Sequence, residues 1–278
     1  MQRRVLLPDG EAVPALGQGT WHMGERATER SAEVAALQAG LDAGLTLIDT
    51  AEMYGDGGAE RVVGQAVTVR RDEVFIVSKV FPWNASRQGV ARSCERSLER
   101  LGTDRIDLYL LHWRGGGSLA DTVAGFRDLQ RAGKIRHWGV SNLDAADLEE
   151  LWEVPNGREL ATDQLLYHLA ERGIDWDTLP WLRGRGIPAM AYCPLGQGRL
   201  LHDDRLQGFA ERHGMTPAQA ALAGLLDQGD VIAIPKSRTL GRVAENSGAL
   251  EVALTEAQRA ELEGLFPPPD GPRPLAIV

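Results

Sequence analysis

Four polar residues with complementary chemistry lie just after short apolar segments of the sequence. Asp49 follows the apolar run 45–48, and Tyr54 comes five residues later in a glycine-rich stretch. Lys79 and His112 end the next two apolar runs. A carboxylate, a phenol, an ammonium and an imidazole are together the groups needed to move a proton onto a substrate oxygen.

The phenol is the group in this set whose pKa must be shifted by its neighbours. A free tyrosine has a pKa near 10, which is too high for efficient proton transfer near neutral pH. An adjacent ammonium lowers that pKa, and a carboxylate can hold the ammonium in place. We therefore expect Asp49 to steady Lys79, Lys79 to lower the pKa of Tyr54, and Tyr54 to protonate a carbonyl oxygen that a neutral His112 N–H holds. Considered alone, each residue is more simply explained as a solvated strand end or a packed side chain.

The apolar runs that carry these residues recur regularly along the chain. Their ends are spaced about 30 residues apart, and amphipathic stretches lie between them, as in a (β/α)₈ barrel. An open doubly wound sheet shows the same alternation and is the competing fold. In a barrel, the carboxyl ends of the strands share one mouth, so the four residues would meet there. The runs end at positions 19, 49, 79, 112, 141, 164, 192 and 235.

The helices between these runs are expected from their periodicity. The clearest covers 86–101, where Val90, Cys94, Leu98 and Leu101 share one face. A turn at 9–10 predicts an N-terminal β-hairpin over 5–13. The further expected helices cover 28–43, 119–132, 144–151 and 216–226.

Two stretches depart from the regular alternation. The long interval before position 235 predicts an inserted loop after the seventh strand. The proline-rich tail 266–274 can be neither helix nor central strand. We expect it to form an extended arm over the body, at the mouth of the barrel, or else a loose terminus. No Ser- or Pro-rich linker interrupts the chain, so residues 1–278 are expected to form a single domain.

Composition excludes several classes of function. The chain has 278 residues and a net charge of −9, which argues against a nucleic acid or an anionic membrane as partner. Its two cysteines, Cys94 and Cys193, form no zinc-site spacing, and a reducing cytoplasm fits them. No apolar run approaches the ~18 residues of a membrane span, and no signal segment is expected. We expect a cytoplasmic protein without a metal.

The local motifs resemble those of a known family. IDTAEMYG at 48–55, VSKVFPWN at 77–84 and LYLLHW at 108–113 together resemble the catalytic tetrad of the aldo-keto reductases, and the similarity runs over nearly the whole chain. GKIRHWGVSNL, QLLYHL and MAYCPLGQGRL resemble a bacterial branch associated with methylglyoxal reduction. The resemblance implies NADPH-dependent reduction of small aldehydes or ketones, with methylglyoxal and aromatic aldehydes as candidate substrates. We expect a monomer that acts on a small carbonyl compound.

The resemblance also implies where NADPH lies. Ser141, Asn142 and Gln164 would bind the nicotinamide carboxamide, and Tyr192 would stack on the ring. Considered alone, Ser141 and Asn142 could instead precede a helix as its cap. No GxGxxG motif with a following acidic residue is present, in agreement with a cofactor site outside a Rossmann domain. Asp163 stands where many relatives have asparagine, and it would alter the charge near the carboxamide.

The other end of the cofactor would lie after the eighth strand. Lys236, Ser237 and Arg242 would clamp the 2′-phosphate, because charge-assisted donors favour NADPH over NADH; a solvated basic face is the simpler alternative. Glu245 and Asn246 would face the adenine. The complete set of expected cofactor-binding residues is Gly19, Thr20, Trp21, Ser141, Asn142, Gln164, Tyr192, Leu195, Gly196, Gly198, Lys236, Ser237, Arg238, Arg242, Glu245 and Asn246.

Aromatic residues just beyond the strand ends are the expected walls of the substrate pocket: Trp21, Phe81, Trp83 and Trp113.

Two other functions are compatible with parts of the pattern. One is a reductase-like protein that binds NADPH only as a sensor, which would not need Tyr54. The other is a metal-dependent barrel hydrolase built on Asp49 and His112, for which the remaining histidines offer no HxH or HxxxH spacing.

Overall fold

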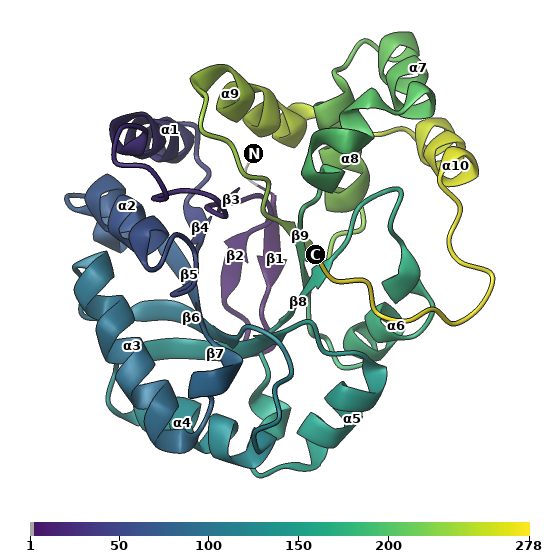
Figure 1. The fold of residues 1–278 in the computed structure, drawn as a ribbon. Helices are drawn as coiled ribbons and strands as arrows, with labels where there is room; N and C mark the ends of the chain where they lie inside the picture. Colours follow the sequence, from purple (N-terminus) through teal and green to yellow (C-terminus); the bar gives the residue numbers. More distant parts are fainter. Residues whose placement is uncertain (1–2) are drawn as a thin grey trace.

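The computed structural model describes residues 3–278 and shows a (β/α)₈ barrel (Figure 1). Eight parallel strands pair in chain order from β3 to β10. The first and last strands also meet, because Gly19 N donates to Pro235 O at 3.0 Å and Gly17 N donates to Ala233 O at 2.9 Å. The barrel prediction is confirmed, since an open sheet would leave these two edges apart. The strands are β3 Gln18–Gly19, β4 Leu47–Asp49, β5 Phe75–Val80, β6 Ile106–Leu111, β7 Ile135–Ser141, β8 Asp163–Leu166, β9 Ala189–Tyr192 and β10 Val231–Ala233.

The strands are apolar on both faces because both faces are covered. Every residue of β5 and of β6 is buried, as parallel strands between a barrel interior and a helical layer must be. Trp138 on β7 and Tyr109 on β6 are fully buried and pack around Phe126 in the helical layer. The polar residues that sequence placed at the strand ends therefore stand where the apolar interior stops.

The predicted helices are present with small shifts at their ends. Helix α3 covers Arg87–Leu101 and begins at Ser86, whose hydroxyl accepts from Gly89 N at 3.2 Å. Its buried face contains Val90, Cys94 and Leu98, as the periodicity indicated. The helices are α1 Arg30–Asp42, α2 Gly58–Val67, α3, α4 Leu119–Arg131, α5 Ala145–Glu153, α6 Thr178–Arg183, α7 Asp204–Arg212, α8 Pro217–Leu226, α9 Leu240–Gly248 and α10 Glu256–Leu265.

The segment after β9 differs from the inserted loop that the spacing predicted. It is longer than the other connections, as expected, but much of it is helical. The 3₁₀ segment Gly196–His202 is followed by α7, and its backbone kinks at Gln197 (φ 57°) and Gly198 (φ 87°). The short amphipathic helix α7 buries Leu206 and Phe209 in a second small core, which its local sequence signal did not reveal.

The N-terminal hairpin and the C-terminal tail lie at opposite ends of the barrel. The predicted hairpin forms from β1 Arg4–Leu6 and β2 Ala12–Pro14. Its Glu11 bonds to Arg136 and His137 near the start of β7, so the hairpin covers the amino ends of the strands.

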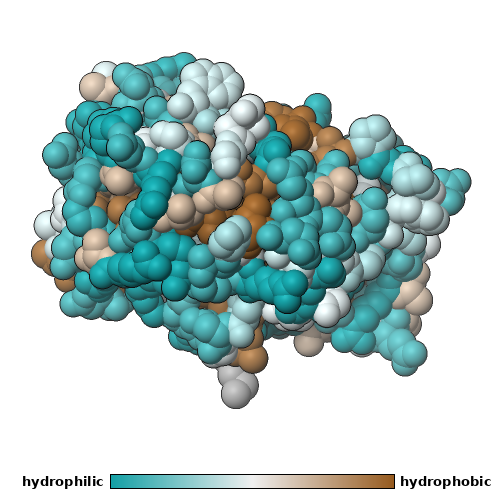
Figure 2. All heavy atoms as spheres, turned by 90° about the horizontal axis from the view of Figure 1, so that it is seen from below, coloured by the Kyte–Doolittle hydropathy of each residue, from teal (hydrophilic) through white to brown (hydrophobic). Residues whose placement is uncertain are grey.

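No helix within residues 3–278 is long and apolar enough to cross a membrane. The face seen from below is mostly hydrophilic, with smaller hydrophobic areas (Figure 2).

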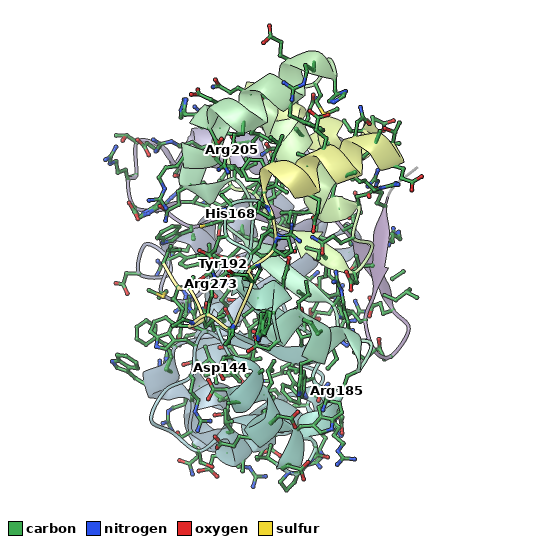
Figure 3. All side chains as sticks on the ribbon, turned by 90° about the vertical axis from the view of Figure 1, so that its right-hand side faces the viewer. Asp144, His168, Arg185, Tyr192, Arg205 and Arg273 are labelled. Atoms are coloured by element: carbon green, nitrogen blue, oxygen red, sulfur yellow. The ribbon has the colours of Figure 1, made fainter. Side chains whose placement is uncertain are left out.

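The C-terminal tail takes the first of its two expected forms. Phe266 is buried under the guanidinium of Arg205, 4.4 Å from the ring centre, and its carbonyl accepts from Arg172 at 2.7 Å. From this anchor the tail runs back across the body (Figure 1) and through the region of Tyr192 and Arg273 (Figure 3). Its last residues, 277 and 278, line the cavity at the mouth of the barrel.

Candidate active site

The four residues of the predicted catalytic set meet at the carboxyl ends of the strands. Lys79 Nζ lies 2.7 and 2.8 Å from the two carboxylate oxygens of Asp49 and 3.4 Å from the hydroxyl of Tyr54. The His112 ring stands edge-on to the Tyr54 ring, with centroids 5.6 Å apart. Asp49, Tyr54 and His112 line a cavity of about 1050 Å³, and Lys79 lies fully buried behind them.

Neighbouring strands explain why residues far apart in sequence converge. Asp49 ends β4, and Lys79 lies near the end of the adjacent strand β5, two residues beyond the partner of Asp49 in the ladder. Tyr54 is carried by the loop from β4 to α2. Gly55 (φ 56°) lies in that loop, where a Cβ would come within 2.9 Å of the carbonyl oxygen of Met23. The glycine is therefore needed for the chain to turn the phenol back over the barrel.

The pKa of Tyr54 corrects one expectation. We expected the Lys79 ammonium to lower it, but burial raises the pKa of the phenol well above its usual value, and the charge of Asp49 adds to this effect. Asp49 neutralises much of the lysine charge that the phenol would otherwise feel. Tyr54 is therefore a firmly protonated phenol at neutral pH in the cofactor-free protein.

The Lys79–Asp49 pair is enclosed by the protein. Burial raises the pKa of Asp49 and lowers the pKa of Lys79, while their mutual attraction opposes both shifts. Additional hydrogen bonds hold the pair: Lys79 donates to Thr50 O at 2.9 Å, and Gln164 Nε2 donates to Asp49 at 2.7 Å. A buried ion pair with further hydrogen bonds holds its geometry, because breaking it would leave an unpaired charge in the protein interior.

His112 is a neutral imidazole in this environment. Burial, followed by the nearby Lys79 charge, lowers the pKa of His112 to about 2. Its Nδ1 is buried without a hydrogen-bond partner. A neutral ring has one N–H to donate, so His112 is suited to hold an oxygen rather than to carry a charge.

The residues expected to bind the nicotinamide end are also brought together. Ser141 Oγ donates to Gln164 O at 2.8 Å, and Asn142 Nδ2 donates to His112 O at 3.2 Å. Tyr192 Oη donates to Asn142 Oδ1 at 2.8 Å. All four of the side chains named for this end line the cavity. They form one hydrogen-bonded cluster that joins the ends of β7, β8 and β9.

Asp163 lies beneath this cluster and does not line the cavity. Neighbouring residues of a strand point to opposite faces, and Gln164 is the one that faces the mouth. Asp163 is fully buried, and burial raises the pKa of its carboxyl well above the usual value. The carboxyl of Asp163 therefore lies behind the cavity wall and not beside the carboxamide position.

At the other end of the cavity, the structure separates two of the expected residues from the rest. Lys236, Ser237 and Arg242 line the cavity together with Glu245 and Asn246. Arg238 and Gly196 do not line it. Arg238 instead turns towards helix α1, where it pairs with Glu29 at 2.5 Å. The remaining expected cofactor residues that line the cavity are Gly19, Thr20, Trp21, Leu195 and Gly198.

The expected aromatic walls divide into two groups. Trp21 and Trp113 line the cavity, whereas Phe81 and Trp83 do not. These two pack against Trp113, with ring centroids 5.1 and 5.9 Å from it, and Trp83 remains 75% exposed. Trp83 belongs to the short 3₁₀ turn Pro82–Asn84, which directly follows Phe81.

Sequence reasoning did not identify several cavity-lining residues. One of them is Arg199, a cation in the kinked segment after β9. Its place in the motif MAYCPLGQGRL was a sequence feature from which it could have been predicted. The tail was expected at the mouth of the barrel, but its last residues, 277 and 278, were not named as part of the site. The residues not anticipated are His22, Met53, Cys193, Pro194, Gln197, Arg199, Leu201, His202, Ala218, Ile234, Pro235, Ile277 and Val278.

Among residues 3–278, no cluster of metal-ligating side chains includes Asp49 or His112. In the part of the chain that the structure describes, one cluster has the spacing of metal ligands, and it consists of Asp9, Glu11 and His137. This cluster belongs to the hairpin end of the barrel and does not line the cavity. Its histidine is already bonded to Glu11 at 2.7 Å.

The comparisons with known proteins agree with this geometry. Residues 15–266 match the aldo/keto reductase family. The chain is 50% identical, over the full length of both proteins, to methylglyoxal reductase YeaE of Escherichia coli K12. A crystal structure of an aldo/keto reductase from Klebsiella pneumoniae in complex with NADP and acetate superposes with a TM-score of 0.97 at 48% identity, with both chains fully covered. A structure of an aldo-keto reductase from the same organism in complex with NADPH gives a TM-score of 0.96 at 48% identity, also with both chains fully covered.

Proposed function

Because the chain belongs to the aldo/keto reductase family, we propose that it reduces small aldehydes and ketones to alcohols with NADPH, and that Tyr54 donates the proton. The chain is an NADP-dependent oxidoreductase. The observation that carries the proposal is the 3.4 Å contact between the Lys79 ammonium and the Tyr54 hydroxyl, inside a cavity that a neutral histidine also lines.

Tyr54 gives up its proton only when negative charge develops on the substrate. The raised pKa of Tyr54 keeps the phenol protonated until negative charge develops on the carbonyl oxygen. The O–H bond of the phenol then breaks and the proton moves to that oxygen, which leaves a phenolate beside the ammonium of Lys79. Asp49 holds the ammonium in place, and solvent returns the proton to Tyr54. The N–H of His112 fixes the carbonyl oxygen.

The cavity suits a long dinucleotide. NADPH supplies hydride from C4 of its nicotinamide ring. The cluster of Ser141, Asn142, Gln164 and Tyr192 offers amide and hydroxyl groups for the carboxamide end. Lys236 and Arg242 offer cations for a phosphate at the other end. Burial lowers the pKa of Lys236, and a bound phosphate would favour its charged form. The volume of about 1050 Å³ lies just above the usual range for ligand cavities, about 300–1,000 Å³.

The substrate class follows from the mouth of the cavity. Trp21 and Trp113 provide flat apolar walls beside Tyr54 and His112. A small dicarbonyl such as methylglyoxal or an aromatic aldehyde fits such walls, and the 50% identical relative is named a methylglyoxal reductase. We also infer that the enzyme acts as a cytoplasmic monomer, as its sequence led us to expect; light scattering on the purified protein tests the monomer.

The variant Tyr54→Phe tests the mechanism, because it removes a single hydroxyl. We expect its turnover with methylglyoxal and benzaldehyde to fall by about 10²–10⁴-fold, while its Kd for NADPH stays within about twofold of the wild-type value. NADPH oxidation at 340 nm and a binding titration measure the two quantities. Wild-type turnover in the variant would contradict the role of Tyr54. Binding without turnover in the wild-type protein would favour a sensor.

A further inference from the structure

An ion pair connects the residue before helix α1 to the loop after β10, next to the end of the cavity that Lys236 and Ser237 line. Arg238 Nη1 lies 2.5 Å from Glu29 Oε2, although the residues are 209 positions apart in the sequence. Glu29 immediately precedes helix α1, and Arg238 immediately follows Ser237 of the cavity wall. Helices α1 and α9 pack side by side here (Figure 1). The pair therefore lies beside the proposed phosphate position.

Charged groups of both signs surround that position. The pKa of Lys236 is lowered first by burial and then by the charge of Arg238, while Glu33, Glu25 and Glu29 act in the opposite direction. These groups are thus within electrostatic reach of the same ammonium. A phosphate bound at Lys236 would attract Arg238, which lies two residues further along the chain, and it would be repelled by Glu29.

The geometry of the pair leaves Arg238 able to change partners. A single nitrogen–oxygen contact joins it to Glu29, and their side chains are 48% and 30% exposed. Glu29 also accepts from Arg26 at 2.9 Å, so it keeps a partner if Arg238 leaves. Exposed pairs of this kind contribute little free energy. A phosphate can accept two parallel hydrogen bonds from a guanidinium, which is the stronger interaction.

We propose that Glu29 sets the selectivity of this enzyme between NADPH and NADH by competing with the 2′-phosphate of the nucleotide for Arg238. This inference rests on the proposed function. Binding of NADPH exchanges the Glu29 contact for a phosphate contact, so the loss of the Glu29 contact opposes NADPH binding. NADH has no 2′-phosphate, and it leaves the pair intact. Glu29 is a positioning residue that holds Arg238 away from the site until a phosphate arrives.

The test compares nucleotide affinities in two glutamate variants that remove the same charge. Glu29→Gln frees Arg238. Glu25→Gln is the matched control, because Glu25 also acts on Lys236 but pairs with His22 at 2.7 Å instead of with Arg238. We expect Glu29→Gln to lower the Kd for NADPH by about 2- to 5-fold, which corresponds to the free energy of an exposed pair. Its Kd for NADH should not change, and Glu25→Gln should change the selectivity ratio by less than half as much.

A double variant separates competition from a general charge effect. Calorimetric titration with NADPH, NADH and adenosine 2′,5′-bisphosphate measures all affinities without turnover. In an Arg238→Gln background, Glu29→Gln should no longer change the ratio of NADPH to NADH affinity. Weaker NADPH binding in Glu29→Gln, equal effects of both glutamate variants, or an unchanged effect in the Arg238→Gln background would each overturn the proposal. Failure of the wild-type protein to bind NADPH would instead contradict the proposed function.

Discussion

The two ends of the cavity use the same kind of ion pair under opposite conditions. At the inner end, the Lys79 and Asp49 side chains are 0% and 4% exposed and share two short contacts. At the outer end, the Arg238 and Glu29 side chains are 48% and 30% exposed and share one. A buried pair cannot exchange its partner without leaving a charge in the protein interior, whereas an exposed pair can exchange with solvent or ligand. The inner end therefore maintains a fixed geometry, and the outer end can respond to the nucleotide.

Breaking the inner pair gives the largest expected effect on stability. Lys79→Met removes the ammonium and leaves the Asp49 carboxyl buried with one fewer partner. We expect the free energy of unfolding to fall by about 3–5 kcal/mol, as measured by urea denaturation. The double variant Asp49→Asn, Lys79→Met should regain a large part of that loss but no activity. A loss from Lys79→Met as small as that from Arg238→Gln would contradict the contrast between the two ends.

The neutral His112 at the inner end predicts a pH dependence of stability. Its pKa is about 2 in the folded protein and about 6.5 in the unfolded chain. The unfolded chain alone binds this proton as the pH falls from about 6.5 towards 2. The stability that His112 contributes is thus complete above about pH 6.5 and falls by up to about 1.4 kcal/mol per pH unit below it.

The variant His112→Gln should lose this part of the acid sensitivity. The measurement is the free energy of unfolding between pH 4 and pH 7 in the wild-type and variant proteins, with the exposed His202→Gln as control. Below about pH 6.5, we expect the free energy of unfolding to fall more steeply with pH in the wild type than in His112→Gln. The difference in slope should approach about 1.4 kcal/mol per pH unit, which corresponds to one proton. Parallel curves would show that His112 titrates equally in both states.

Cys193 is expected to give the smallest effect, although it lines the cavity beside Tyr192. Burial raises the pKa of its thiol to about 11, so it is not a reactive thiolate near neutral pH. Cys193→Ser keeps a small side chain at a residue with φ 48°. We expect kcat and KM to remain within about twofold of wild type. A severe loss of turnover in steady-state assays would assign Cys193 a role in the site.

The fold was accessible from the sequence because its signals are local. Helix α3 was predicted within one residue of its observed start, since its cap and its apolar face lie within one stretch of chain. The recurrence of apolar runs indicated the barrel. Helices α2, α6, α7 and α10 were not predicted; α7 and α10 pack into a small core separate from that of the barrel.

The sequence by itself determined which side chains stand at the strand ends, because strand length and apolar pattern place Asp49, Lys79 and His112 at one mouth. Only the tertiary structure decided their protonation and the partner of Arg238. The pKa of Tyr54 depends on burial and charge summed over several strands. Arg238 meets Glu29 only because the last strand closes against the first and brings α9 beside α1. Such effects arise from neighbours in space, which a linear pattern does not specify.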